Sequence, residues 1–360
     1  MALFRPFLLF IAVNVYAQTP PADSLVTSPE IHPDRTVTFR VKAPDAQKIG
    51  LFGDWMPIGK LEPLTKGADG VWTLTTGPID ATGHLYTFNI DGVVVPDPVN
   101  PKIKLRQRTS ASLLEIPDPS AAWAERDVPR GSVVTEWQKS AVLSRTERMV
   151  IYLPPGYQKS TARYPVLYLV HGSGDVPESW TNAGNANLIL DNLIADKKAK
   201  PMIVVMPAGH AALYGSRGQN NSELFDQYLL KEIIPFTESH YRVAAGRANR
   251  ALAGLSMGGG HTINVGFAHP ELFSAIGPFS PAVPRDFDTK YKLEKAPGFS
   301  LVWIACGDQD NTVQYPRVKQ FAENLNTHHV RATLRTIEGG AHTWPVWRVC
   351  LSEFAPMLFR

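Results

Sequence analysis

Cysteine is scarce in this chain, because its 360 residues include only Cys306 and Cys350. A framework of several disulfides is therefore excluded, and a chain of this length buries a large core without one. Cys306 ends an apolar run that begins at Val302, a pattern typical of a buried strand, so we expect a small buried thiol there. A disulfide between Cys306 and Cys350 is the alternative, since disulfides form in proteins that are exported from the cytoplasm.

An excess of charge of one sign is also missing, because 36 Lys and Arg residues face 33 Asp and Glu residues. The sequence has no basic run with interleaved aromatic residues, so we expect no nucleic acid partner. Metal-binding spacings are missing as well. His328 and His329 are adjacent and their side chains diverge, and no H-E-x-x-H or paired-cysteine motif occurs. We therefore expect neither a metal nor a cofactor.

Long apolar runs are confined to the N-terminus, where residues 7–13 are too few to span a bilayer. Arg5 precedes this run, and Val15-Tyr16-Ala17 fits a small-residue cleavage site. This order is typical of a secretory signal peptide, which we assign to residues 1–17. We expect a secreted or periplasmic protein with no membrane partner, and the sequence leaves its oligomeric state open.

Two patterns divide the rest of the chain. Short strands with period-two alternation are predicted at residues 36–41, 49–53, 71–75 and 85–90, and Asp91-Gly92 is a hairpin signal. They predict a small all-β sandwich over residues 25–118. Residues 119–133, which contain Pro119, Pro129 and Gly131, are expected to form a linker.

From residue 134 onward, strand and helix patterns alternate. Strands are predicted at residues 149–153, 166–170, 203–206, 251–253, 302–306 and 333–337, and amphipathic helices at 187–198 and 222–240. Continuously apolar strands are typical of a sheet covered on both faces. Residues 134–360 are therefore expected to form an α/β domain with a doubly wound, mostly parallel sheet.

The segment Gly254-Leu255-Ser256-Met257-Gly258 links a predicted strand to a predicted helix. A G-x-S-x-G motif in this setting is typical of a nucleophile elbow, a sharp turn that exposes the serine hydroxyl at the strand's end. The flanking glycines let neighbouring backbone pass where a Cβ would clash. We predict that Ser256 is a catalytic nucleophile.

A serine nucleophile needs a histidine base and an acid that orients it, and in this architecture the acid precedes the histidine. Of the five histidines after Ser256, only His342 lies in a Gly-rich loop directly after a predicted strand. Asp308 and Asp310 both follow the strand at residues 302–306. Spacing favours Asp310 as the acid, and the other aspartate would cap the helix that begins near Thr312.

An oxyanion formed at the reacting carbonyl needs preorganised donors. One predicted donor is the backbone N–H of Met257, the residue after the nucleophile. The other is the N–H of Ser173 or Gly172, in the loop after the strand at residues 166–170, with Ser173 favoured. His171 is expected to support this loop.

Three tryptophans are predicted to lie in loops near the site: Trp180, Trp344 and Trp347. They are candidates for an aromatic wall that binds a substrate ring or sugar. Packing against the last helix is an equal alternative for Trp344 and Trp347.

These motifs together resemble the esterase D-type branch of the α/β hydrolases, which includes feruloyl esterases, acetyl xylan esterases and enterochelin esterase-like proteins. The resemblance covers residues 134–360 and also depends on Tyr152-Leu153-Pro154-Pro155-Gly156-Tyr157 and Gly339-Gly340-Ala341-His342. It implies an α/β hydrolase fold and favours Asp310, because the family's acid follows a Cys-Gly or similar pair by a few residues. Ser173 departs from the family, in which an apolar residue is usual.

The first domain resembles early-set immunoglobulin-like modules that precede such esterases, with Gly53-Asp54-Trp55 among its cues. Related modules bind glycans, and in esterases others only pack on the catalytic domain.

The sequence thus predicts a secreted serine carboxylic ester hydrolase that removes feruloyl or acetyl groups from plant polysaccharide through an acyl-enzyme. The expected partner is an acylated polysaccharide or a small ester. The alternatives are an enterochelin esterase-like or general short-chain carboxylesterase, and an inactive glycan-binding protein.

Overall fold

The N-terminal part of the chain forms two antiparallel sheets that share one core. In the computed structural model, residues 26–57, 59–213, 220–287 and 298–360 are described, and the signal peptide predicted for residues 1–17 lies outside them. One sheet has the order β1-β2-β6-β5, and the other the path β4-β3-β7-β10-β9 with β8 paired to β7. Their strands are β1 (Glu30–Ile31), β2 (Val37–Lys42), β3 (Ile49–Gly53), β4 (Glu62–Pro63), β5 (Thr65–Lys66), β6 (Val71–Thr76), β7 (Gly83–Ile90), β8 (Val93–Val95), β9 (Ile103–Lys104) and β10 (Ala111–Glu115).

The apolar residues of these strands face one another across the two sheets. Phe39 of β2 and Phe88 of β7 are fully buried, and burial of such a ring contributes about 1.5–3 kcal/mol. The predicted hairpin at Asp91-Gly92 is confirmed, since it joins β7 to β8 and both residues have positive φ. That geometry matches the twist of the flanking strands.

The C-terminal part is built on an eight-stranded sheet with the order β11-β12-β14-β13-β15-β16-β17-β18. β11 and β12 are antiparallel to their neighbours, and the strands from β14 to β18 are parallel. The sheet begins at Ser132, inside the segment expected to be a linker. The strands are β11 (Ser132–Ser140), β12 (Arg145–Leu153), β13 (Val166–Val170), β14 (Ile203–Met206), β15 (Arg250–Leu255), β16 (Ala275–Phe279), β17 (Leu301–Gly307) and β18 (Ala332–Ile337).

Helices cover both faces of this sheet, as the continuously apolar strands predict. Alternate residues of β13 belong to opposite layers: Tyr168 is part of the core that includes α3, α4, α5 and α7, and Leu167 of the core that includes α1, α2 and α8. The helices are α1 (Ser179–Asn182), α2 (Ala186–Ala195), α3 (Asn221–Tyr228), α4 (Ile234–His240), α5 (Met257–Ala268), α7 (Tyr315–Thr327) and α8 (Trp344–Phe354), with short turns η2 (Tyr157–Lys159), η4 (Arg247–Asn249) and η6 (Ala355–Met357).

Several elements differ from the sequence prediction, among them one helix and one central strand of the larger sheet. The helix expected at residues 222–240 is divided, because a π-helical segment, η3 (Leu229–Ile233), joins α3 to α4. Strand β16 was not predicted. It contains Gly277 and Pro278, residues that are disfavoured in a central strand.

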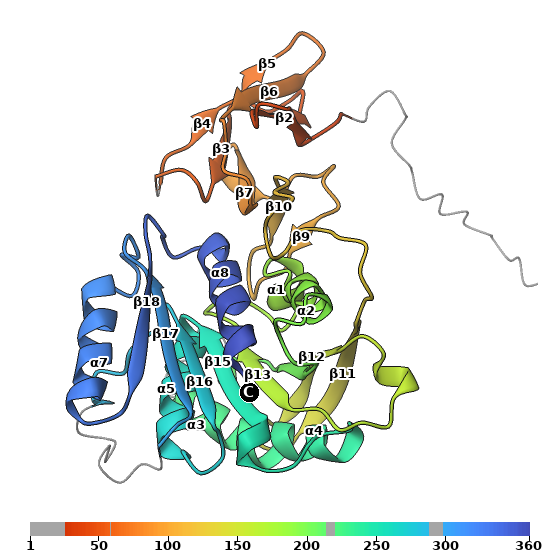
Figure 1. The fold of residues 1–360 in the computed structure, drawn as a ribbon. Helices are drawn as coiled ribbons and strands as arrows, with labels where there is room; N and C mark the ends of the chain where they lie inside the picture. Colours follow the sequence, from red (N-terminus) through yellow and green to blue (C-terminus); the bar gives the residue numbers. More distant parts are fainter. Residues whose placement is uncertain (1–25, 58, 214–219, 288–297) are drawn as a thin grey trace, which may run out of the picture.

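Figure 1 shows the N-terminal sheets above α8 and α1 of the larger part, and hydrogen bonds and an ion pair join the two parts. The connecting segment is fastened to α2, where Asn192 donates hydrogen bonds to the carbonyls of Ala122 and Ala124. Glu115 of β10 forms a bidentate ion pair with Arg348 of α8.

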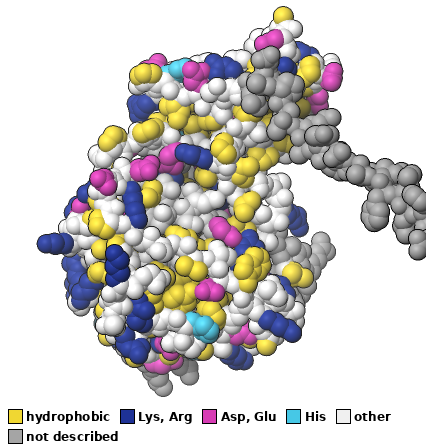
Figure 2. All heavy atoms as spheres, turned by 90° about the vertical axis from the view of Figure 1, so that its right-hand side faces the viewer, with side chains coloured by type: hydrophobic (Ala, Val, Ile, Leu, Met, Phe, Trp, Pro, Cys, Tyr) yellow, Lys and Arg dark blue, Asp and Glu magenta, His cyan; other side chains and the backbone are white. Residues whose placement is uncertain are grey.

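Figure 2 shows that Lys and Arg side chains are interspersed with Asp and Glu side chains over the face that it displays. None of the helices in the described part of the chain has the length and apolar character required to cross a bilayer.

Candidate active site

Ser256 occupies the sharp turn between β15 and α5. Its φ of 53° and ψ of −113° are unusual for a residue other than glycine. The turn needs close backbone approach, because a Cβ on Gly258 would lie 2.4 Å from the carbonyl oxygen of Val170. A Cβ on Gly254 would lie 2.6 Å from the backbone of Gly258. The glycines of the motif are thus the residues that let the turn pack against β13.

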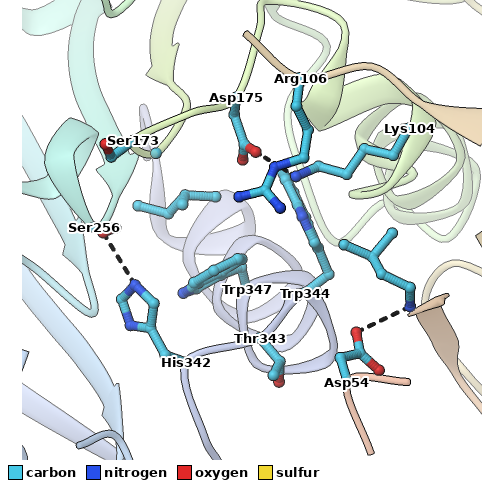
Figure 3. A pocket seen from close by; sticks show the side chains of 13 residues that line it. Asp54, Lys104, Arg106, Ser173, Asp175, Ser256, His342, Thr343, Trp344 and Trp347 are labelled. Carbon is cyan, nitrogen blue, oxygen red and sulfur yellow. Dashed lines mark hydrogen bonds and ion pairs between the residues drawn. The ribbon is translucent and has the colours of Figure 1, made fainter. Parts of the chain in front are cut away.

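His342 lies in the loop between β18 and α8, at the same edge of the sheet as Ser256. Its Nε2 is 3.0 Å from the Ser256 hydroxyl oxygen, and its Nδ1 is 2.6 Å from a carboxylate oxygen of Asp310 (Figure 3 shows the first of these contacts). A histidine that donates from Nδ1 to a carboxylate keeps Nε2 free to accept a proton. The three side chains form a continuous hydrogen-bonded series.

Asp310 lies in the loop that follows β17, and its side chain is fully buried. Its second carboxylate oxygen accepts hydrogen bonds from the backbone N–H groups of Thr312 and Val313. Burial acts to raise the pKa of Asp310, but the hydrogen bond and charge of His342, together with the N–H of Val313, outweigh burial and hold that pKa below its usual value.

Asp308 has a different contact. Its carboxylate accepts a hydrogen bond from the backbone N–H of Gly339, 2.8 Å away. The backbone N–H of Gln309 also donates to the carbonyl of Gly340. These bonds tie the loop after β17 to the loop that carries His342, so Asp308 holds the position of the histidine loop without touching the ring.

The loop after β13 faces Ser256 across the turn. The N–H groups of Gly174 and Asp175 are engaged, the first with His210 Nε2 and the second with the carbonyl of Gly172. Among the described residues, no hydrogen-bond partner is found for the N–H of Gly172 or Ser173. The N–H of Met257 is at the first position of α5, where intrahelical partners are missing. Both predicted sources of oxyanion donors therefore lie beside Ser256.

His171 and His210 support this loop through hydrogen bonds to its backbone. His171 donates from Nδ1 to the carbonyl of Gly172 and accepts the N–H of Gly209 at Nε2. Burial lowers the pKa of His171, and burial, together with the repulsion that a protonated His171 would exert, lowers the pKa of His210 to about 4. Both rings are therefore neutral at pH 7, the state in which Nε2 accepts a hydrogen bond.

A cavity of about 210 Å³ opens at Ser256 and His342. Its remaining lining comes from both parts of the molecule: Asp54, Leu85, Lys104, Arg106, Gly172, Ser173, Asp175, Leu255, Thr343, Trp344 and Trp347. The first four of these residues, all from the N-terminal part, were not predicted from the sequence. Nothing in the local pattern marks them, since they reach the site only through the docking of the N-terminal sheets.

The three candidate tryptophans separate in the structure. Trp344 and Trp347 line the cavity, and Trp347 lies edge-to-face with His342 at 5.0 Å between ring centroids (Figure 3). Trp180 is fully buried and packs against Trp344 and Phe279. The prediction that Trp180 lines the substrate site is therefore wrong, because α1 turns this ring into the core.

Groups of three or more potential metal-ligating side chains are not found in the described ranges of the chain. Cys306 and Cys350 are both buried and free. The Sγ of Cys306 lies 3.8 Å from a carboxylate oxygen of Asp310. The prediction of a small buried thiol at Cys306 is confirmed, and burial raises the pKa of this thiol to about 12, so it stays protonated at neutral pH.

Comparison with known protein families identifies the larger domain. Residues 140–358 match the family model described as putative esterase. Among curated proteins, an endo-1,4-beta-xylanase/feruloyl esterase of Xylanibacter ruminicola is 35% identical over 349 residues, which cover 92% of this chain and 46% of the relative. An esterase of Mycobacterium tuberculosis is 38% identical over 117 residues, covering 30% of this chain and 23% of the relative. The chain thus spans less than half the length of either protein.

Solved structures share the fold. A ferulic acid esterase of Anaeromyces mucronatus is 25% identical with a TM-score of 0.60, covering 67% of this chain and 96% of that one. The enterobactin esterase of Shigella flexneri is 17% identical with a TM-score of 0.69, and the match covers 90% of this chain and 92% of that one. The second likeness extends over most of both parts of the molecule and concerns the fold alone.

Proposed function

The chain belongs to the putative esterase family, and from this we propose that it is a serine carboxylic ester hydrolase in which Ser256, His342 and Asp310 form the catalytic triad. The observation that carries the proposal is the unbroken series of hydrogen bonds from the Ser256 hydroxyl through His342 to the buried Asp310. A serine is a weak nucleophile at neutral pH unless a base of this kind takes its proton.

The proposed reaction has two halves. The Ser256 oxygen attacks the ester carbonyl carbon while His342 Nε2 takes the hydroxyl proton, and the tetrahedral intermediate places its negative oxygen against the N–H groups of Met257 and of Ser173 or Gly172. The C–O bond to the alcohol then breaks, and His342 returns the proton to the departing oxygen. Water repeats the sequence on the acyl-enzyme and releases the acid. Asp310 stabilises the imidazolium formed in each half.

For the substrate, we propose feruloyl or acetyl esters of plant polysaccharide. The likeness to the xylanase/feruloyl esterase over 92% of this chain supports this choice. The aromatic rings of Trp344 and Trp347 at the cavity offer surfaces on which a phenolic or sugar ring packs. An enterochelin-type or general short-chain ester is the second candidate, supported by the shared two-part fold of the enterobactin esterase.

We further propose that the protein is exported to a periplasm or to the outside, and that the N-terminal sheets form an immunoglobulin-like module. The signal-like order of residues 1–17 supports export. Two antiparallel sheets around one core support the module assignment. Mass spectrometry of protein recovered from the cell exterior or the periplasm tests export: a mature chain beginning at Gln18 is expected, and an unprocessed cytoplasmic chain contradicts it.

A substrate panel tests the proposed activity. Purified protein and its Ser256→Ala variant are assayed on methyl ferulate, acetylated xylan, 4-nitrophenyl acetate and a catecholate siderophore ester. Hydrolysis that falls about 10⁴-fold or more in the variant, with an unchanged thermal unfolding curve, is expected for a triad serine. The preferred ester decides between the two substrate candidates. Normal turnover by Ser256→Ala excludes the mechanism, and binding of xylan without hydrolysis of any ester favours an inactive glycan-binding protein.

A further inference from the structure

Arg106 of the N-terminal part extends into the active-site cavity from the side opposite His342. It follows β9, and Figure 3 shows its guanidinium pointing into the space in front of Ser256. Arg106 is neither a member of the proposed triad nor one of the proposed oxyanion donors. Its position at the cavity places it where a bound substrate would meet it.

The other charged groups on the cavity wall already have partners. Lys104 is paired with Asp175 in a contact that is buried on both sides. Asp54 is paired with His84 at 2.9 Å and also accepts the backbone N–H of Leu85.

His342, which also lines the cavity, has a charged partner as well, because its Nδ1 is hydrogen-bonded to the carboxylate of Asp310. Within the described part of the chain, Arg106 has neither a hydrogen bond nor an ion pair, so its charge is the one on this wall that no protein group balances.

The backbone that carries Arg106 is fixed in place. On one side the buried Lys104 is held by Asp175, and on the other the backbone N–H of Gln107 donates to the carbonyl of Gly174 at 2.8 Å. Asn182 of α1 also donates to the carbonyl of Ile103. These contacts fix the backbone on both sides of Arg106, so the side chain starts from a defined place at the cavity, while the exposed guanidinium keeps the freedom to meet a bound group.

We propose that Arg106 forms a subsite for a carboxylate carried by the ester substrate. The inference rests on the proposed esterase function and adds a substrate class to it: an acidic ester, whose carboxylate sits either on the alcohol, as on an acidic sugar, or on the acyl group. A planar guanidinium matches a carboxylate with two parallel N–H···O bonds, which gives both attraction and orientation. The triad and oxyanion donors would then act on an ester that Arg106 has positioned.

Two pairs of matched esters test the subsite and distinguish the two sources of the carboxylate. On the alcohol side, 4-acetoxybenzoate is compared with 4-acetoxybenzamide. On the acyl side, the 4-nitrophenyl monoester of succinate is compared with that of succinamate. Each pair differs only in the replacement of a carboxylate by a neutral amide. The wild-type protein and the variants Arg106→Gln, Arg106→Lys and Lys102→Gln are assayed on all four esters.

Arg106→Gln is expected to lower kcat/KM for one carboxylate ester about tenfold more than for its amide partner, mainly through KM. Arg106→Lys should retain only part of the preference, because an ammonium group lacks the guanidinium fork. Lys102→Gln removes the same charge from an exposed position in the same segment, outside this cavity, and should leave the preference of the wild type. Raising the salt concentration should reduce the preference of the wild type.

Equal effects of Arg106→Gln on the acid and the amide of both pairs would overturn the subsite while leaving the esterase function intact. A binding measurement covers the case in which no ester is turned over. Calorimetric titration of the four esters into Ser256→Ala and into Ser256→Ala/Arg106→Gln should show tighter binding of one carboxylate ester that the second substitution removes. Identical affinities in the two proteins overturn the proposal whatever the catalytic result.

Discussion

Lys104 of β9 and Asp175 of the loop after β13 form an ion pair across the two parts of the molecule, with both side chains buried. The same loop contains Gly172 and Ser173, which line the cavity beside Ser256 and whose N–H groups have no hydrogen-bond partner among the described residues. Gln107 adds a backbone hydrogen bond to Gly174 of the same loop. The N-terminal sheets are therefore structural supports of the active site as well as part of its wall.

The first prediction concerns this ion pair. Lys104→Met leaves the Asp175 carboxylate buried and unpaired, and removing one partner of a buried pair costs about 3–5 kcal/mol of unfolding free energy. Turnover should fall as well, because the loop with the oxyanion donors loses one of its anchors. Urea denaturation and kcat for 4-nitrophenyl acetate measure the two effects.

A double variant separates the loss of charge pairing from the loss of packing. Lys104→Met/Asp175→Leu removes both charges and should recover much of the stability, since an apolar pair of similar volume often replaces a buried ion pair without cost. Lys102→Met, at an exposed position, is the control. A single variant as stable as the wild type would show that the pair does not hold the two parts together.

The second prediction distinguishes the two aspartates after β17. Asp310→Asn disturbs the tautomer and orientation of His342, and loss of this acid is expected to reduce kcat by about 10⁴-fold. Asp308→Asn keeps an oxygen that accepts the N–H of Gly339, so its kcat should stay within about tenfold of the wild type. Steady-state kinetics on one neutral ester gives both values. A larger loss in Asp308→Asn than in Asp310→Asn would reverse the assignment.

The third prediction concerns acid stability and His210. Its pKa is lowered from 6.5 to about 4 in the folded protein, first by burial and then by the repulsion that a protonated His171 would exert. Between these values the unfolded chain binds more protons than the folded protein, so stability rises with pH in this window. The contribution is fully present above about pH 6.5 and is lost as the pH falls toward 4.

His210→Gln tests this dependence, because an amide oxygen accepts the N–H of Gly174 and does not titrate. Unfolding free energies of the wild type and the variant are measured by denaturant at pH 4.5, 5.5, 6.5 and 7.5. The wild type should lose more stability than the variant between pH 6.5 and 4.5. His171, whose pKa is also lowered, keeps part of the slope in the variant. Parallel curves for the two proteins would contradict the prediction.

The sequence predicted those parts of the site that depend on local pattern. The turn at Ser256 is encoded by its own glycines, and His342 is placed by the strand that precedes it. In a parallel sheet the carboxyl ends of neighbouring strands lie at one edge, so residues far apart along the chain converge there. The hydrogen bonds at 3.0 and 2.6 Å agree with this rule.

Other features depended on packing that no local pattern records. Trp180 comes soon after the loop that follows β13, a position from which a side chain could contact the substrate. In the structure α1 directs Trp180 into the core, where it packs against Trp344. Lys104 and Arg106 reach the cavity only because the N-terminal sheets dock on that loop. Strand β16 was not predicted because it contains Pro278, and a residue without a backbone N–H is disfavoured in a central strand. In the structure Pro278 nevertheless lies in β16, opposite Gly254 of β15.

The last prediction concerns the second ion pair between the two parts of the molecule. Arg348 of α8 is fully buried and forms two parallel hydrogen bonds with Glu115, while its Nε donates to the carbonyl of Ala183. Its guanidinium also lies 5.6 Å from the ring centroid of Trp123 in the connecting segment. Arg348 therefore joins β10, α8 and the segment between the two parts.

Glu115→Ala leaves the fully buried Arg348 guanidinium without its carboxylate and should lower the unfolding free energy by about 2–3 kcal/mol, less than for a fully buried pair because the Glu115 side chain is 29% exposed. Glu353→Ala is the matched control, because it breaks the bidentate pair of Glu353 with Arg335, in which both side chains are partly exposed. A surface pair of this kind is worth about 0–1 kcal/mol. Repeating both measurements at 1 M salt adds a second test: the effect of Glu353→Ala should shrink and that of Glu115→Ala should persist, since buried charges are screened far less. Equal, salt-sensitive losses in the two variants would show that Arg348 and Glu115 contribute no more than an ordinary surface pair.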